Sequence, residues 1–188
     1  MPKWSNGSIS TFVTGKQSSH FVTLLSFDYK SVFRVLNRLE VNYLLVGGLN
    51  FFLIHKPVST QDIDVFIDDT PSNRRQCELA LADLDASWGK LDEEWGPVRD
   101  KTAGWLSSQG VYCTLTRFGP LDVFRSIAGI SAFSRAEAVA ISFQFSESEF
   151  VKLISASDLL SCQLSLPEQY RKQDRVSYLK EILKDLSR

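Results

Sequence analysis

The stretch from Gln61 to Asp68 constrains the fold more than any other part of the chain. Three aliphatic residues, Ile63, Val65 and Ile67, alternate here with residues that are mostly acidic. Because successive side chains of a β-strand point to opposite faces, this pattern predicts a strand with one aliphatic and one acidic face. The aliphatic face must pack against a core, which leaves the acidic face for a surface or a site.

The acidic face presents two carboxylates, Asp62 and Asp64, two positions apart. On a strand their Cα atoms would lie roughly 6.5–7 Å apart on the same side. Such side chains can converge on one hard cation, since Mg²⁺ is usually held by one or two carboxylates with waters and substrate phosphates. A solvated acidic face is the alternative, although like charges placed side by side destabilise a strand. Asp68, at the end of the strand, is expected to be a solvated turn residue.

Hydrophobic periodicity predicts helices and strands in mixed order. The expected helices are 28–39, 49–55, 74–84, 157–164 and a last one through 176–186. The expected strands are 43–46, 61–68, 111–118, 121–124, 141–145 and 150–154. Asp28 and Ser157 are expected to cap helices, and residues 88–110 are expected to form loops with short helices. We therefore expect an α/β (α+β) fold with a mixed sheet: one domain over 28–188, helical from about 156, after a loosely ordered lead-in over 1–27.

Composition excludes several classes of protein. The chain has 188 residues, of which 44% are hydrophobic and 23% charged, as in a globular domain rather than a disordered one. We find no apolar run of about 18 residues and no apolar secretory signal at the N-terminus, so we expect a cytoplasmic protein without a membrane span. The three cysteines form no Cys-x-x-Cys pair and only two histidines are present, which favours free thiols over a zinc site.

Charge is unevenly distributed along the chain. The formal net charge is −1, but residues 61–100 hold four Lys/Arg and eleven Asp/Glu, whereas residues 1–60 hold six and two. An acidic centre could hold a cation while the basic ends meet an anionic partner. A solvated surface whose charges merely cluster along the chain is the alternative.

Two further features belong with the acidic strand. Gly47-Gly48 follows the strand 43–46 and begins a helix, so its backbone N–H groups could bind phosphate without a side chain in the way. A tight turn is the alternative for these glycines. Asp122 lies in a strand with the same alternation, and if the two strands are neighbours, three carboxylates line one rim. Three carboxylates suffice to hold two metal ions about 3.5–4 Å apart.

The spacing of these motifs resembles a known signature. Val46-Gly47-Gly48, thirteen residues, and then Asp62-Ile63-Asp64-Val65 is similar to the pattern of the polymerase-beta-type nucleotidyltransferase superfamily. Thr60, two residues before the first aspartate, resembles the form found in small bacterial members, which include the nucleotidyltransferase toxins of toxin–antitoxin systems. Asp122 stands where the third carboxylate of the family is expected.

The resemblance implies a fold and a reaction. The fold would be a mixed β-sheet with flanking helices and a helical C-terminal tail. The reaction would move a nucleoside monophosphate from a nucleoside triphosphate (NTP) to an acceptor hydroxyl and release pyrophosphate. Catalysis and binding of Mg²⁺ or Mn²⁺ would fall to Asp62, Asp64 and Asp122, and nucleotide binding to Gly47, Gly48 and Thr60. The sequence does not name the acceptor: RNA or tRNA is our working hypothesis, with a protein hydroxyl and a small molecule as alternatives. For a toxin-like enzyme, a cognate antitoxin protein would be a partner.

The chain also departs from the family pattern. Val58 stands where small relatives often carry an arginine, and Gln163 stands where a lysine is common. Fewer cations near a triphosphate motivate a second hypothesis, a non-catalytic descendant that binds a nucleotide or a protein. For an RNA acceptor, Arg171, Lys172 and Arg175 are the expected phosphate contacts, although a solvated helix start would explain them equally well.

Overall fold

The computed structural model describes residues 28–90 and 94–186, so the predicted lead-in over 1–27 lies outside the described residues. The α-helices are α1 (Tyr29–Arg38), α2 (Gly47–Ile54), α3 (Pro71–Asp83), α4 (Phe133–Ala138), α5 (Ala156–Ser165) and α6 (Gln173–Leu186). The strands are β1 (Tyr43–Leu45), β2 (Ile63–Ile67), β3 (Ser87–Trp88), β4 (Gly96–Pro97), β5 (Val111–Thr116), β6 (Gly119–Phe124), β7 (Ile141–Ser146) and β8 (Glu149–Leu153). Three 3₁₀ turns, η1 (Val98–Asp100), η2 (Trp105–Ser107) and η3 (Glu168–Tyr170), join them. In this part of the chain no helix is both long and apolar enough to cross a membrane.

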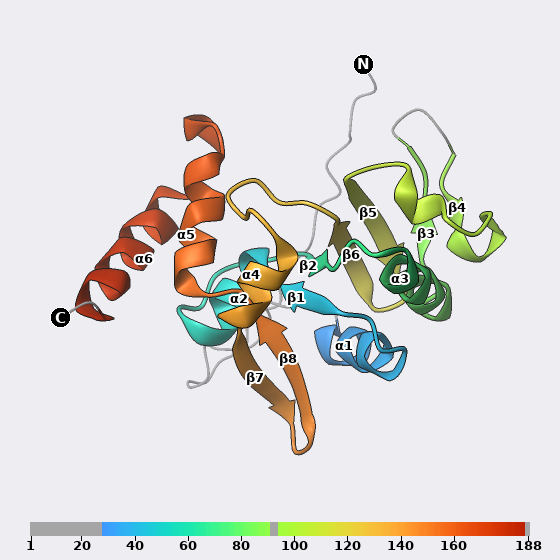
Figure 1. Cartoon of the computed structure of the whole chain (residues 1–188), viewed down its shortest axis with the longest axis horizontal. Helices are drawn as coiled ribbons and strands as arrows, with labels where there is room; N and C mark the ends of the chain where they lie inside the picture. Colours follow the sequence, from blue (N-terminus) through green and yellow to red (C-terminus); the bar gives the residue numbers. More distant parts are fainter. Residues whose placement is uncertain (1–27, 91–93, 187–188) are drawn as a thin grey trace, which may run out of the picture.

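The strands form one mixed sheet in the order β4-β3-β5-β6-β2-β1-β8-β7. The pairs β2/β6 and β1/β8 are parallel, and the other pairs are antiparallel. A parallel neighbour requires a long connection, which β2 and β6 obtain through α3 and the β3–β5 region. This topology places the two strands that carry the predicted carboxylates side by side at the centre of the sheet (Figure 1).

Two hydrophobic clusters hold helices on the sheet. The first packs α1 and α3 onto the sheet and includes the aliphatic face of β2, in which Ile63, Val65 and Ile67 are fully buried. The second contains residues of α4, α5 and α6 and the β2 residue Phe66, whose ring lies 5.3 Å from that of Phe133. Figure 1 shows α5 and α6 side by side, away from α1 and α3. The mixed α/β architecture predicted from the alternating elements is therefore confirmed.

Some local expectations were wrong. Ser155, rather than Ser157, caps α5 by accepting from the backbone N–H of Asp158, so this helix begins earlier than predicted. Helix α3 begins at Pro71 instead of residue 74, because the Thr70 side chain accepts from the N–H of Asn73 and proline fits the first helical turn.

Short elements escaped prediction altogether. Helix α4 has six residues and no side-chain cap, and β3 and β4 have two residues each, in a region expected to hold only loops and short helices. Elements this short contain too few residues to show a hydrophobic periodicity in the sequence. Trp88 and Trp105 pack in this region against Tyr112, with every pair of ring centroids 5.3 Å apart.

Candidate active site

Three carboxylates converge at the edge of the central strands. Asp64 on β2 is the register partner of Asp122 on β6, and Asp62 immediately precedes β2. Each of the three offers a carboxylate oxygen that lies within 4.8 Å of the others. Since neighbouring strands are only about 4.8 Å apart, the parallel pairing is what brings Asp122 to this spacing. The structure thus brings the three predicted metal ligands together.

The electrostatics of this cluster favour a cation. Burial, followed by repulsion from Asp62 and Asp122, raises the pKa of Asp64 to about 7. A hydrogen bond from the Gly48 backbone and the positive charge of Arg175 act in the opposite direction. Burial also raises the pKa of Asp122. Negative charges held this close and partly out of water repel each other, and a divalent cation would relieve the repulsion.

A thiol that sequence reasoning missed lies beside the cluster. The Cys113 Sγ on β5 donates to Asp122 Oδ2 at 3.4 Å, because the hairpin register pairs these two residues. Burial and the neighbouring carboxylate raise the pKa of this thiol to about 11, so it stays protonated near neutral pH. The predicted hairpin contained the signal, but only the exact register shows which β5 residue faces Asp122.

The glycine pair packs directly against the carboxylate strand. Gly47 has a φ of +66°, and a Cβ built there would lie 1.9 Å from Asp64 Oδ2. A Cβ at Gly48 would lie 2.5 Å from Thr60 Oγ1, which itself donates to Asp62 Oδ1 at 3.2 Å. The two glycines open α2, whose N-cap residue makes no side-chain hydrogen bond. The Gly48 backbone N–H donates instead to the Asp64 carboxylate, so the helix start and the carboxylate strand are directly linked. Both glycine positions therefore require the absence of a side chain.

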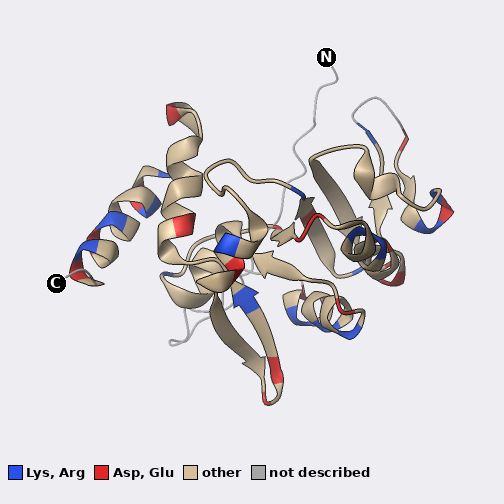
Figure 2. Cartoon of the chain, in the orientation of Figure 1, with Lys and Arg blue, Asp and Glu red and all other residues tan. Residues whose placement is uncertain are grey.

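Two cations from the C-terminal tail reach this place. An open pocket of about 420 Å³ runs along the glycine pair, and both Lys172 and Arg175 line it. Arg175 Nη1 lies 3.7 Å from the Cβ position of Gly48, and its guanidinium stacks on Phe51 with 5.4 Å to the ring centroid. Figure 2 shows basic residues along α6, the helix that carries Arg175. An anion at the glycine pair would thus meet the N-terminus of α2 and the tail cations together.

The three cations predicted to contact the acceptor, Arg171, Lys172 and Arg175, lie in two different environments. Arg171 donates to the carbonyl oxygens of Leu164 and Leu166, at 2.9 and 2.8 Å, and so holds the C-terminal end of α5. Lys172 and Arg175 instead line the pocket beside the glycines. In the described part of the chain, the three cations therefore do not form one separate acceptor surface.

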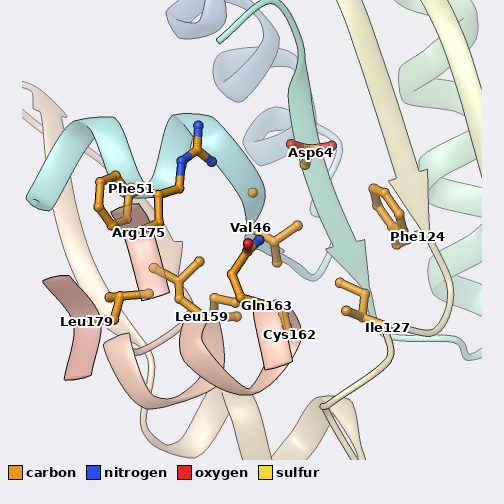
Figure 3. Close-up of a pocket in the computed structure, with 12 residues that line it drawn as sticks. Val46, Phe51, Asp64, Phe124, Ile127, Leu159, Cys162, Gln163, Arg175 and Leu179 are labelled. Atoms are coloured by element: carbon orange, nitrogen blue, oxygen red, sulfur yellow. The ribbon is translucent and has the colours of Figure 1, made fainter. Parts of the chain in front are cut away.

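Val58 and Gln163, which stand where relatives often carry cations, both have identifiable surroundings in the structure. Val58 packs against the second hydrophobic cluster. The neighbouring Lys56 places its Nζ 4.2 Å from the centroid of the Tyr178 ring. Gln163 projects from α5 between the glycine pocket and a smaller apolar cavity of about 150 Å³ (Figure 3). Arg175, which comes from the tail, supplies the positive charge at the glycines.

Comparisons with known proteins agree with this geometry at the level of fold. No family model matches the chain, and no curated protein matches it significantly. A solved lincosamide antibiotic adenylyltransferase, LnuA with bound lincomycin, is similar with a TM-score of 0.54 and 14% identity, over 82% of this chain and 95% of that one. ANT(2")-Ia in complex with adenylyl-2"-tobramycin is similar with a TM-score of 0.52 and 10% identity, over 84% of this chain and 87% of that one.

These likenesses show that the chain has the fold of polymerase-beta-type nucleotidyltransferases, as the glycine and aspartate motifs predicted. The comparisons therefore establish the fold of this chain, and not its substrate or its reaction. The narrower resemblance to toxins of toxin–antitoxin systems stays a prediction, as does the cognate antitoxin.

Proposed function

We propose that this protein is a metal-dependent nucleotidyltransferase that moves a nucleoside monophosphate from an NTP to an acceptor hydroxyl. The observation that carries the proposal is the triad Asp62, Asp64 and Asp122, with ligand atoms within 4.8 Å of one another beside the glycine pair. Acidic clusters occur without function, but a carboxylate strand packed against an uncapped Gly-Gly helix start is built to receive both a cation and a phosphate.

The donor set fits Mg²⁺ or Mn²⁺. All three groups offer carboxylate oxygens, which hard cations prefer, and burial followed by repulsion from Asp62 and Asp122 raises the pKa of Asp64. Asp62, Asp64 and Asp122 would hold the metal. When bound, the metal supplies neutralisation of the charge on the reacting phosphate.

The chain's own residues would orient the reactants. Gly47 and Gly48, which leave room for a phosphate beside the start of α2, would with Arg175 and Lys172 bind the β- and γ-phosphates and so stabilise the departing pyrophosphate. The acceptor oxygen would form a bond to the α-phosphorus while the bond from that phosphorus to the bridging oxygen breaks. The proton of the acceptor hydroxyl would pass to Asp122.

Replacing Arg175 by Ala is expected to raise the Kd for NTP about tenfold or more, because one charge-assisted contact to phosphate is lost. Equilibrium titration with NTP in the presence of Ca²⁺ measures this change without turnover. Arg34→Ala is the matched control, since Arg34 pairs with Glu149 at 2.9 Å on the distant β7–β8 hairpin. Equal affinities of the two variants would show that Arg175 does not contact the phosphates.

We favour a small-molecule hydroxyl as the acceptor over RNA or tRNA. Several cations that could meet a polyanion already have partners, since Arg34 pairs with Glu149, Arg38 pairs with Asp83 at 2.5 Å, and Arg171 holds carbonyl oxygens of α5. LnuA is named for a lincosamide antibiotic, and ANT(2")-Ia was solved with adenylyl-tobramycin. Those names support a small acceptor for this chain without identifying it.

The test is incubation with each α-labelled NTP, Mg²⁺ or Mn²⁺, and separate RNA, protein and small-molecule extracts. Label in the small-molecule fraction supports the proposal, whereas label in RNA would return the acceptor to RNA or tRNA. Tight metal-dependent NTP binding without transfer to any fraction would favour the non-catalytic descendant. The same incubation without divalent metal serves as the control.

A further inference from the structure

Beside the carboxylates lies a second cavity that the proposed reaction has not yet used. It has a volume of about 150 Å³ and lies between the first turn of α2 and the helices α5 and α6 (Figure 3). Its apolar wall includes Val46, Phe124, Ile127, Leu159, Cys162 and Leu179. Gly47, Asp64, Gln163 and Arg175 line both this cavity and the open pocket along the glycine pair. A ligand that fills both would be charged in one part and flat or apolar in the other.

The position of the cavity favours the nucleoside over the acceptor. In an in-line displacement the leaving pyrophosphate and the attacking hydroxyl lie on opposite sides of the phosphorus. Asp122 marks the acceptor side in the proposed reaction, and neither Asp122 nor Asp62 belongs to the described residues that line the cavity. The cavity borders Gly47 and Asp64, where the donor nucleotide would lie. Its apolar walls suit the faces of a base.

Gln163 turns a hydrogen-bond donor toward this space. Its Oε1 accepts from the backbone N–H of Lys172 at 2.9 Å. Because a backbone N–H can only donate, this contact identifies the oxygen end of the amide and leaves Nε2 as the free end. Among the described residues, Nε2 makes no hydrogen bond, and Figure 3 shows the side chain pointing from α5 into the space between the labelled residues.

We propose that Gln163 selects the base of the NTP and that this cavity favours uracil over cytosine. The inference rests on the proposed function. Of the three polar or charged side chains that line the cavity, Asp64 is committed to the metal and Arg175 to the phosphates, which leaves Gln163 Nε2, a donor, for the base. Uracil presents a carbonyl oxygen where cytosine presents an amino group. An amino group in this cavity would be left without an acceptor, which a site built to donate rejects strongly.

The test compares UTP with CTP, which differ only along one edge of the ring: uracil has a 4-carbonyl and an N3–H, whereas cytosine has a 4-amino group and an unprotonated N3. Kd is measured in Ca²⁺ and kcat/KM in Mg²⁺, for the wild type and two variants. The wild type is expected to prefer UTP by about tenfold or more in both measurements. Gln163→Glu keeps an oxygen for the Lys172 N–H and offers a second oxygen to an amino group, so the preference should reverse toward CTP.

Controls separate base selection from folding and added charge. Gln163→Met removes the amide at similar size, and its UTP/CTP ratio should fall close to 1. Gln144→Glu adds the same charge far away on β7, where Gln144 Nε2 donates to the Glu147 carbonyl, and should keep the wild-type ratio.

Three results would overturn the inference. Equal binding of UTP and CTP by the wild type, or a ratio that neither Gln163 variant changes, would refute base selection while leaving nucleotidyl transfer intact. Absence of binding by any NTP would instead refute the proposed function, and base selection with it.

Discussion

Replacing Asp64 by Asn is expected to reduce nucleotidyl transfer more than a hundredfold and, at the same time, to stabilise the metal-free protein. Transfer falls because a neutral amide is a poor ligand for a hard cation. Stability rises because burial and repulsion by Asp62 and Asp122 raise the pKa of Asp64 to about 7 in the folded state, from the usual 3.8. The folded protein therefore binds this proton more tightly than the unfolded chain does.

The sign of the pH dependence follows from that shift. The contribution of Asp64 to stability is fully present below pH 4 and is lost as the pH rises through about 7. At pH 8 the Asn variant should gain about 4 kcal/mol in the free energy of unfolding, because it avoids the buried charge and a shift of one pKa unit corresponds to about 1.4 kcal/mol. Its melting temperature should also respond less to Mg²⁺ than that of the wild type.

Thermal unfolding at pH 5 and pH 8, with and without Mg²⁺, measures these effects together with transfer. Asp68→Asn is the control, since Asp68 follows the same strand but lies outside the carboxylate cluster. Undiminished, metal-dependent transfer by Asp64→Asn would contradict the proposal that the triad binds the metal. A destabilised variant at pH 8 would contradict the account of its charge.

Replacing Gly47 by Ala is expected to abolish transfer and to destabilise the fold by about 2 kcal/mol or more. The φ of +66° costs an L side chain about 1–2 kcal/mol, and the new Cβ would lie 1.9 Å from Asp64 Oδ2. The carboxylate must move to make room, which displaces a proposed metal ligand. Chemical denaturation and turnover measure the two parts of the effect.

Gly104→Ala isolates the backbone cost. Gly104 has a φ of +90°, and a Cβ there would meet nothing within 4 Å. This variant should lose some stability but keep full transfer. If Gly47→Ala behaved like Gly104→Ala in both measurements, the close approach between the glycine and Asp64 would have no functional consequence.

The strand and glycine motifs could be predicted because their signals are local. The alternation around Asp62 and Asp64 defines a strand by itself, and Gly47-Gly48 defines a helix start after a strand. Asp122 required an assumption about topology, which the parallel β2/β6 pairing confirms. The assumption that the two strands are neighbours was reasonable, because the strand that carries Asp122 shows the same alternation of aliphatic and acidic residues as β2.

The remaining features depend on contacts between segments far apart in the chain. Arg175 reaches the glycines only because α6 folds back beside α2, and Cys113 meets Asp122 only through the hairpin register. The binding of α5 carbonyl oxygens by Arg171 has no local signal either, since a basic residue before a helix is ordinarily solvated. No period or capping pattern in the sequence encodes such contacts.

The central claim is that the triad transfers a nucleoside monophosphate rather than a phosphate. The most direct measurement follows the label of α-labelled and γ-labelled NTP, incubated in parallel with the protein, Mg²⁺ and an acceptor extract. We expect the α label to appear in an acceptor and the γ label in pyrophosphate, with both signals lost in Asp64→Asn. A γ label in the acceptor, or equal transfer by wild type and Asp64→Asn, would contradict the account.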